Sequence, residues 1–448
     1  MARSKTLYQC ANCGATTPKW QGQCPDCGAW NTLAERPAAA GYAGADALAA
    51  LVSLDQCPPE QSPRVPSGFA EFDRVLGGGL VPGSVVLLGG DPGVGKSTLL
   101  LQVGAALPTD ARPIYVSGEE SAQQVAARAH RLGIGERPLP LLTDTSVSSI
   151  LAAATRARAT VIVVDSIQTM VVDEVSSAAG SVTQLREAVG AFVRFAKQHD
   201  VCVLLVGHVT KEGVIAGPRV VEHMVDTVLY FESDPSSRFR VVRAVKNRFG
   251  ASNELGFFAM DAQGFREVRN PSAMFLSRQS AERPGSIVLV SWEGSRPLLV
   301  ELQSLVTDAV AGQPRRLVNG LDQNRLPLLL AVLQRHAGLS LAGQDVFVNV
   351  VGGLRIAEPA ADLATLLAIV SSFRDRSLPA ELVAFGEVGL AGEVRPVRFG
   401  EERLLEAAKQ GFGKAIVPAG NKPRRAVDGL TVHAVETLEQ AVDAVTAA

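Results

Sequence analysis

The stretch "VVLLGGDPGVGKSTLL", Val85 to Leu100, decides the fold of this chain. Its first residues form an apolar run that predicts a strand buried on both faces, and its last residues predict a helix. Between them stands the phosphate-loop pattern G-x-x-x-x-G-K-[ST], whose backbone N–H groups surround phosphate oxygens at a helix amino terminus. We therefore expect bound ATP. The residues expected to contact it are Gly90, Asp91, Pro92, Gly93, Val94, Gly95, Lys96, Ser97 and Thr98.

The side chains around this loop predict a hydrolytic site. Lys96 is expected to neutralise the β- and γ-phosphates, and the Ser97 hydroxyl to bind Mg²⁺. The run "VIVVDS" places Asp165 at the end of another apolar strand, as the second Mg²⁺ ligand. "YVSGEES" ends a further strand with Glu119 and Glu120. Glu119, nearer the strand end, is the preferred general base, but both acids can also simply open a helix, where the dipole favours them.

Strand and helix patterns alternate from about Arg64 to Gly264, which predicts an α/β fold with a mainly parallel sheet covered on both faces. The predicted strands are 85–90, 113–117, 161–165, 201–206, 226–232 and 239–245. The predicted helices are 96–107, 119–132, 147–157 and 184–199. A second α/β region follows, with strands near 286–291 and 344–351 and helices near 322–337, 361–373 and 401–410.

The amino-terminal stretch "CANCGATTPKWQGQCPDCG" contains two C-x-x-C pairs, Cys10 with Cys13 and Cys24 with Cys27. Four thiolates at this spacing are typical of one tetrahedral Zn²⁺ site. Two disulfides are disfavoured, because "MARSKTLYQC" lacks the apolar segment of a secretory signal. Nearby Trp20 and Trp30 are expected to pack against this small unit, with base stacking as the alternative.

Composition limits the possible partners. The 448 residues are 47% hydrophobic with a net charge of −2, so any nucleic acid has to be met by local basic patches. No uncharged apolar run reaches about 18 residues, so we expect a cytoplasmic protein without a membrane span. The expected domains are a zinc unit at 1–35, an Ala-, Gly- and Pro-rich linker at 36–62, an ATPase domain at 63–270 and a further domain at 271–448.

The segment "RVPSGFAEFDRVLGGGLVPGSVVLLGGDPGVGKSTLL", 64–100, resembles the RecA/DnaB superfamily of ATPases. With the four cysteines, "GHVTKEG" at 207–213 and "KNRFG" at 246–250, the chain resembles the RadA (Sms) family of bacterial DNA-repair proteins over essentially its whole length. The resemblance implies a DNA-dependent ATPase of recombinational repair that binds single-stranded and branched DNA and drives branch migration. It also implies a homo-oligomer, a hexameric ring, that works with the RecA recombinase and a replicative helicase.

In this family ATP lies between subunits, so the resemblance implies that Lys246 or Arg248 reaches the ATP of a neighbouring subunit. Which of the two does so is left open, and a solvated basic strand end is the plain alternative. DNA loops are implied at 170–184 and 209–223. His208, which ends the strand before the 209–223 loop, is a candidate γ-phosphate sensor or an ordinary loop histidine. The expected DNA contacts are Lys211, Arg219 and Arg248.

The carboxy-terminal region resembles the proteolytic domain of Lon protease, through "EPAADLATLLAIVSS" at 358–372 and "AFGEVGLAGEVRPVRFGEERLLEAAKQGF" at 384–412. Lon uses a Ser/Lys dyad, and the alignment puts Ala360 and Arg403 at those positions. Alanine has no nucleophile, and arginine is effectively never deprotonated. We therefore expect a Lon-like fold without proteolysis. The rival functions are an ATP-dependent protease and an ATP-switched adaptor that is not a motor.

Overall fold

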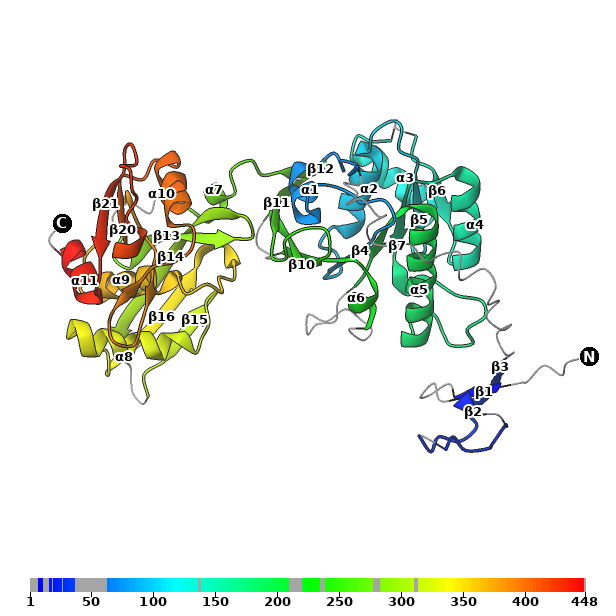
Figure 1. Ribbon diagram of the computed structural model, residues 1–448, viewed down its shortest axis with the longest axis horizontal. Helices are drawn as coiled ribbons and strands as arrows, with labels where there is room; N and C mark the ends of the chain where they lie inside the picture. Colours follow the sequence, from blue (N-terminus) through cyan, green and yellow to red (C-terminus); the bar gives the residue numbers. More distant parts are fainter. Residues whose placement is uncertain are drawn as a thin grey trace, which may run out of the picture.

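The computed structural model describes residues 7–10, 16–17, 19–25, 27–36, 63–135, 138–208, 220–233, 238–276, 283–309 and 313–446. Figure 1 shows two large domains, each with helices packed on a sheet. The described strands form sheets of three, nine and seven strands and one two-stranded pair. The expected α/β class is confirmed. The predicted linker lies outside the described residues, apart from Arg36 at its start.

The nine-stranded sheet is built around β4 (Val85–Gly90), which leads into the phosphate loop. Strands β9, β4, β8, β7, β5 and β6 run parallel, and β10, β11 and β12 continue the sheet antiparallel. Across the sheet the order is β12 (Gly264–Glu267), β11 (Leu255–Asp261), β10 (Phe239–Asn247), β9 (Thr227–Ser233), β4, β8 (Cys202–Val206), β7 (Val161–Asp165), β5 (Pro113–Ser117) and β6 (Leu141–Thr143).

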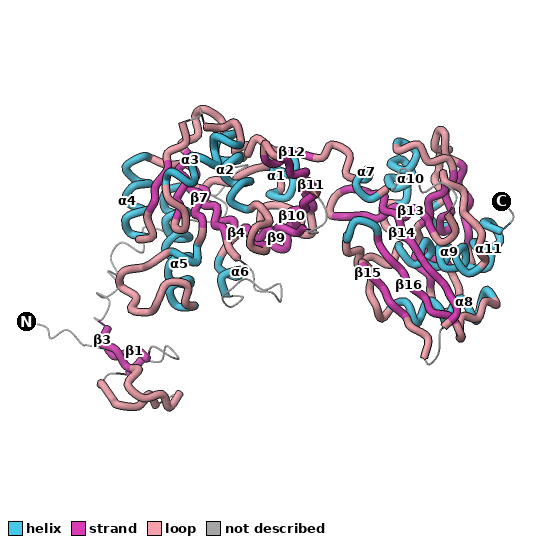
Figure 2. The backbone as a smooth tube through the Cα atoms, turned by 180° about the vertical axis from the view of Figure 1, so that it is seen from behind, coloured by secondary structure: helices cyan, strands magenta, loops and turns pink. Residues whose placement is uncertain are grey.

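Helices cover both faces of this sheet (Figure 2). Val86 and Leu88 of β4 belong to one apolar cluster, and Val85 and Leu87 belong to another on the opposite face, as a strand buried on both sides requires. The first cluster includes residues of α1 (Ala70–Leu76), α2 (Lys96–Ala106) and α3 (Ala122–Arg131). The second includes residues of α4 (Val147–Ala157), α5 (Val182–His199) and α6 (Val220–Met224).

One predicted helix start is wrong in a way that matters for the site. We expected a helix from residue 119, but α3 begins at Ala122, because Ser121 and Gln124 form a capping box. Glu119 and Glu120 therefore lie in the turn between β5 and the helix. Both acids directly precede the N-cap residue Ser121.

The seven-stranded sheet has the order β15 (Arg316–Asn319), β16 (Gln344–Val350), β14 (Arg296–Asp308), β13 (Ser286–Glu293), β17 (Leu382–Ala384), β20 (Lys414–Pro418) and β21 (Thr431–Val435). Strands β18 (Glu387–Val388) and β19 (Val394–Arg395) form the separate pair. The long β14 was not predicted. Helix α9 (Ala361–Phe373) lies in the core of this domain. The remaining helices are α7 (Ser272–Phe275), α8 (Arg325–Ala337), α10 (Gly400–Lys409) and α11 (Leu438–Thr446).

The two large domains share an apolar cluster. Leu255 and Phe257 of β11 belong to the core of the seven-stranded domain. Arg296, at the start of β14, donates to both carboxylate oxygens of Glu71 in α1, at 3.0 and 2.7 Å. Its guanidinium carbon lies 4.9 Å from the centre of the Phe257 ring. Helix α1 and strand β11 are thus joined to the carboxy-terminal domain by both apolar packing and a bidentate ion pair.

Candidate active site

The phosphate loop connects the carboxyl end of β4 to the first turn of α2. The Lys96 ammonium is buried and donates to the carbonyl oxygens of Gly90 (2.7 Å) and Asp91 (2.9 Å). Burial lowers the pKa of Lys96 to about 8, against the opposing effect of the Asp165, Asp91 and Glu119 carboxylates. A buried ammonium held by neutral carbonyl oxygens favours an incoming anion, so the loop fits a nucleotide phosphate.

Asp165 ends β7, two strands away from β4, at the edge of the sheet where the phosphate loop lies. It is only 6% exposed, and its Oδ2 accepts a 2.6 Å hydrogen bond from the Tyr115 hydroxyl. Burial first, and then the Asp165 charge, raise the pKa of Tyr115 well above its usual value, so the phenol stays protonated and donates. Ser97 and Asp165 offer the oxygen ligands that Mg²⁺ prefers.

The structure distinguishes the two acids after β5. Glu120 forms an ion pair with Arg128 of α3. Glu119 Oε1 instead accepts the Ser166 hydroxyl and lies 3.3 Å from Nε2 of His208. Glu119 thus lies beside the residues that follow β7 and β8, whereas Glu120 is occupied by a helix. This arrangement supports the preference for Glu119 as the general base.

Two buried polar atoms, one on His208 and one on Gln168, lack partners among the described residues. Nδ1 of His208 and Oε1 of Gln168 are buried without a hydrogen bond, although the Gln168 amide nitrogen donates to the His208 carbonyl at 3.4 Å. Unpaired buried polar atoms are costly and often mark a ligand position. Tyr115, Gln168 and Ser166 were missed from the sequence. Ser166 and Gln168 could have been found from the sequence, because both are polar residues that closely follow the apolar run of β7.

The turn of residues 246–250, "KNRFG", is tied closely to its own subunit. Lys246 donates to the carbonyl oxygens of Val225 (2.8 Å) and Glu222 (2.9 Å) at the end of α6. Burial, and then the neighbouring Arg248 charge, lower the pKa of Lys246. Arg248 is largely exposed and pairs with Asp226 at 3.1 Å. Of the two cations, Arg248 is exposed, whereas Lys246 is partly buried.

Strand direction places this turn far from the phosphate loop of the same chain. Because β10 is antiparallel to β9, its carboxyl end lies at the opposite edge of the sheet. Asp226, the partner of Arg248, accepts a hydrogen bond from the backbone N–H of Val85 at the start of β4, whereas Gly90 ends that strand. Val85 and Gly90 are five residues apart along β4. At about 3.3 Å per residue, the turn of residues 246–250 and the phosphate loop are therefore about 16 Å apart along the strand direction.

The amino-terminal cysteines converge as their spacing predicts. The sulfur atoms of Cys10, Cys24 and Cys27 lie within 4.8 Å of one another, and Cys13 is outside the described residues. The Cys10 and Cys27 sulfurs are 3.7 Å apart, close to the separation of two ligands around a tetrahedral ion with Zn–S bonds of about 2.3 Å. The three thiols therefore fit a metal site. Trp20 and Trp30 are 56% and 69% exposed, and a Cβ on Gly22 would lie 3.6 Å from the Trp30 ring.

Of the three residues predicted to contact DNA, only Arg248 is among the described residues. Lys211 and Arg219 lie outside the described residues, and Arg248 has the Asp226 contact given above. In the other predicted loop, the side chain of Gln184 donates to the carbonyl oxygens of Val172, Val175 and Ser177 and holds the loop in place. Residues 170–184 contain no lysine or arginine, so any DNA contact made by this loop would come from its backbone or its hydroxyl groups.

Ala360 and Arg403 line one cavity of about 480 Å³ in the carboxy-terminal domain. Arg403 is 1% exposed and donates to both oxygens of Glu358, at 2.8 and 2.6 Å, and to the Val290 carbonyl at 2.6 Å. The residue at the expected lysine position is thus a buried ion-pair partner. Ser371 and Ser372 accept hydrogen bonds from the backbone N–H groups of Gly285 and Val306, so both hydroxyls have structural roles.

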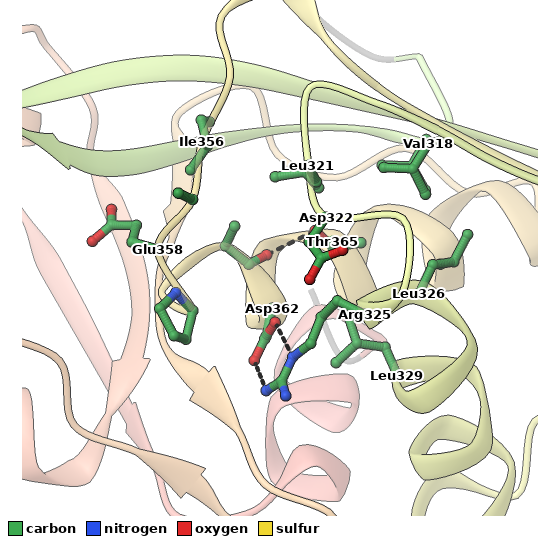
Figure 3. A pocket seen from close by; sticks show the side chains of 14 residues that line it. Val318, Leu321, Asp322, Arg325, Leu326, Leu329, Ile356, Glu358, Asp362 and Thr365 are labelled. Carbon is green, nitrogen blue, oxygen red and sulfur yellow. Dashed lines mark hydrogen bonds and ion pairs between the residues drawn. The ribbon is translucent and has the colours of Figure 1, made fainter. Parts of the chain in front are cut away.

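A second cavity, of about 260 Å³, shares Glu358 and Pro359 with the first. Figure 3 shows Arg325 at this cavity, with its guanidinium directed at Asp362 on α9. Asp362 is almost fully buried and also accepts the Val388 backbone N–H at 3.1 Å. Arg325 is therefore a structural cation that secures α8 to α9.

Three segments of this chain match known protein families. Residues 8–35 match the family described as a rubredoxin metal binding domain, 64–214 an AAA domain, and 328–421 the ChlI subunit of Mg-chelatase. The solved structure of the RadB recombinase aligns with 45% of this chain and 99% of its own, with 21% identity and a TM-score of 0.37. A second solved structure, of an ATPase domain, aligns with 50% of this chain and 98% of its own, with 14% identity and a TM-score of 0.42.

Full-length relatives are much more similar. The DNA repair protein RadA of Pseudomonas aeruginosa is 56% identical over 99% of both chains. The proteins of that name from Escherichia coli and Bacillus subtilis are 54% and 48% identical, over 98% and 94% of both chains. Among the described helices, none is long and apolar enough to cross a bilayer. This chain belongs to the family of the DNA repair protein RadA, with a metal-binding unit, an AAA domain and a Lon-like domain.

Proposed function

We propose that this protein is a DNA-dependent ATPase of recombinational repair. It binds single-stranded and branched DNA, assembles as a hexameric ring, and couples ATP hydrolysis to branch migration together with the RecA recombinase. In each site Lys96 holds the β- and γ-phosphates, Ser97 and Asp165 hold Mg²⁺, and Glu119 activates the attacking water. Bound Mg²⁺ supplies the positive charge that offsets the phosphate charge in the transition state.

The observation that carries this proposal is the direction of β10. It puts the turn of residues 246–250 about 16 Å along the sheet from the phosphate loop of the same chain. Cations there are too far away to serve their own nucleotide. In a ring of like subunits, the largely exposed Arg248 can instead serve the site of a neighbour, with Lys246 supporting the turn from α6.

The rival protease function has less support. The cavity that Ala360 and Arg403 line offers no nucleophile at the expected position, and the guanidinium there is neutralised by Glu358. We propose that the Lon-like domain is an assembly scaffold and a DNA-binding surface. Lys422, Arg424 and Arg425 are exposed at this domain and are available for phosphate contacts.

ATP hydrolysis measured with and without single-stranded DNA tests the motor function. The Lys96→Ala variant is expected to have no ATP hydrolysis under either condition. Equal rates with and without DNA would favour the adaptor. The shared site is tested by mixing Lys96→Ala subunits with Arg248→Ala subunits. Partial recovery is expected, because a Lys96→Ala subunit offers an intact 246–250 turn to a neighbour with an intact phosphate loop. No recovery in oligomers shown to be mixed would mean that Arg248 acts within one subunit.

A further inference from the structure

Arg64, at the start of the ATPase domain, contacts the turn of residues 246–250 from the far end of that domain's sequence. Its Nη2 donates to the Phe249 carbonyl oxygen at 2.7 Å, across 185 residues of sequence. Its Nη1 donates to the carbonyl oxygen of Gly77. One guanidinium therefore bridges the end of α1 and the residue that follows Arg248. None of the roles assigned above uses this side chain.

The backbone holds Arg64 in this place. Val65 and Leu80 form an isolated antiparallel bridge, with N–O distances of 2.9 and 2.8 Å. The bridge lays the Arg64 side chain over the loop of Gly77, Gly78 and Gly79. A Cβ on Gly78 would come within 3.3 Å of the Arg64 Cδ atom, so a small residue there keeps the path of this side chain open.

The same loop is the surface on which the turn rests. Gly77 has a φ of +83°, and a Cβ at this position would lie 2.9 Å from both the Gly250 Cα and the Phe249 oxygen. Asn247 supports the turn from inside: its amide donates to the Val75 carbonyl at 3.2 Å, and its Oδ1 accepts the Phe249 N–H at 2.9 Å. The backbone at Gly77 packs directly against the backbone at Gly250. Arg64 donates to carbonyl oxygens on both segments and so joins them on the exposed side.

The contacts of the turn thus fall on two sides. On one side Lys246 and Arg248 bind the end of α6 and Asp226. On the other side α1, the glycine loop and Arg64 hold Asn247 and Phe249. Arg248 lies between the two sets, so its direction depends on both.

We propose that Arg64 is a positioning residue for Arg248: it fixes the turn of residues 246–250 so that this cation projects toward the ATP of the neighbouring subunit. This inference rests on the proposed function of that turn. Arg64 is itself exposed and lies outside the apolar clusters, so its loss leaves the fold intact and lets the turn shift. Misplacing a catalytic group by about 1 Å can lower turnover by roughly 100-fold.

The first test compares Arg64→Ala with Arg248→Ala in the full chain, each purified as an oligomer of wild-type size. We expect Arg64→Ala to lower DNA-stimulated kcat by roughly 10- to 100-fold, with little change in the KM for ATP. Arg64→Lys, which keeps one donor, should recover part of the rate. Arg131→Ala, which removes an exposed arginine from α3, is the matched control and should be unaffected.

The double variant Arg64→Ala/Arg248→Ala then decides how Arg64 acts. If Arg64 works through Arg248, the double variant is no slower than Arg248→Ala alone. Losses that multiply, a normal rate for Arg64→Ala, or a main effect on KM would each overturn the proposal. This criterion holds whether the turn serves its own subunit or a neighbour.

Mixed oligomers separate this inference from the proposed function. Arg64→Ala should be rescued by Lys96→Ala subunits, because these supply an intact turn, and should not be rescued by Arg248→Ala subunits. Rescue by Arg248→Ala subunits would overturn the inference. If Lys96→Ala rescues neither Arg64→Ala nor Arg248→Ala while the double variant stays non-additive, then the shared site is wrong and Arg64 still positions the turn.

Discussion

The buried pair of Arg403 and Glu358 allows a sharp test of the idea that the residue at the Lon lysine position is structural here. Glu358 Oε1 accepts hydrogen bonds from Arg403 Nη1 and from the Trp292 backbone N–H, at 2.8 and 2.6 Å. Its Oε2 accepts Nη2 of Arg403 at 2.6 Å. In Glu358→Gln the amide oxygen keeps the first two contacts, and the amide NH₂ then faces another donor. The variant thus leaves a buried guanidinium without its counter-charge.

The size of the effect follows from burial. Breaking a buried ion pair by removing one partner costs about 3–5 kcal/mol. The Arg403 side chain is 1% exposed and that of Glu358 is 22% exposed, so solvent relieves part of this loss. We expect Glu358→Gln to destabilise the Lon-like domain by about 2–3 kcal/mol. With an m-value of about 2 kcal/mol/M in urea, the unfolding midpoint falls by about 1–1.5 M.

Tryptophan fluorescence provides the assay. The chain has three tryptophans, and two of them, Trp20 and Trp30, are in the cysteine unit. Replacing those two with phenylalanine leaves Trp292, whose backbone donates to Glu358. Its emission therefore reports the unfolding of this domain alone. An unchanged urea midpoint for Glu358→Gln would refute the reasoning.

A second variant checks the cause. Arg403→Met/Glu358→Gln removes the buried charge together with its partner and keeps an unbranched apolar side chain in the space. It should be more stable than Glu358→Gln alone by about 1 kcal/mol or more, although the bond from Arg403 to the Val290 carbonyl is also lost. A double variant no more stable than Glu358→Gln would mean that lost packing, and not the unpaired charge, explains the effect.

Three further outcomes are expected. Tyr115→Phe removes the hydroxyl that orients Asp165; the Mg²⁺ concentration for half-maximal ATPase should rise roughly 10-fold, as for other residues that orient metal ligands, and an unchanged Mg²⁺ dependence would contradict that role. Cys24→Ser should lose the bound metal, measured by elemental analysis as one Zn²⁺ per chain in the parent protein, while DNA-independent ATP binding persists; retention of the metal would contradict the site. Burial raises the pKa of Glu293 to about 7, so ionising this group disfavours the fold and stability falls as pH rises from about 4.5 to 7; Glu293→Gln should therefore raise the urea midpoint at pH 8 and leave it unchanged at pH 4, and the opposite pH trend would refute this assignment.

The sequence by itself determined the features that depend on short-range spacing. The phosphate loop needs only a strand, eight residues and a helix start, all of which are local, so Lys96 and Ser97 were readable directly. The observed β4, β5 and β7 have the predicted bounds, because a strand buried on both faces leaves an uninterrupted apolar run. The cysteine unit is also recognisable from spacing, because the two members of each pair are close neighbours in the sequence.

Only the tertiary structure decided the features that depend on how distant segments meet. Periodicity predicted a strand before "KNRFG" but not its direction, and that direction puts the turn of residues 246–250 at the far edge of the sheet. The choice between Glu119 and Glu120 depends on Arg128, Ser166 and His208, which come from three different parts of the fold. Arg64 contacts Phe249 although the two residues are 185 positions apart in the sequence, near opposite ends of the ATPase domain. No local pattern encodes such contacts, because they follow from strand order and from packing on the opposite side of a shared sheet.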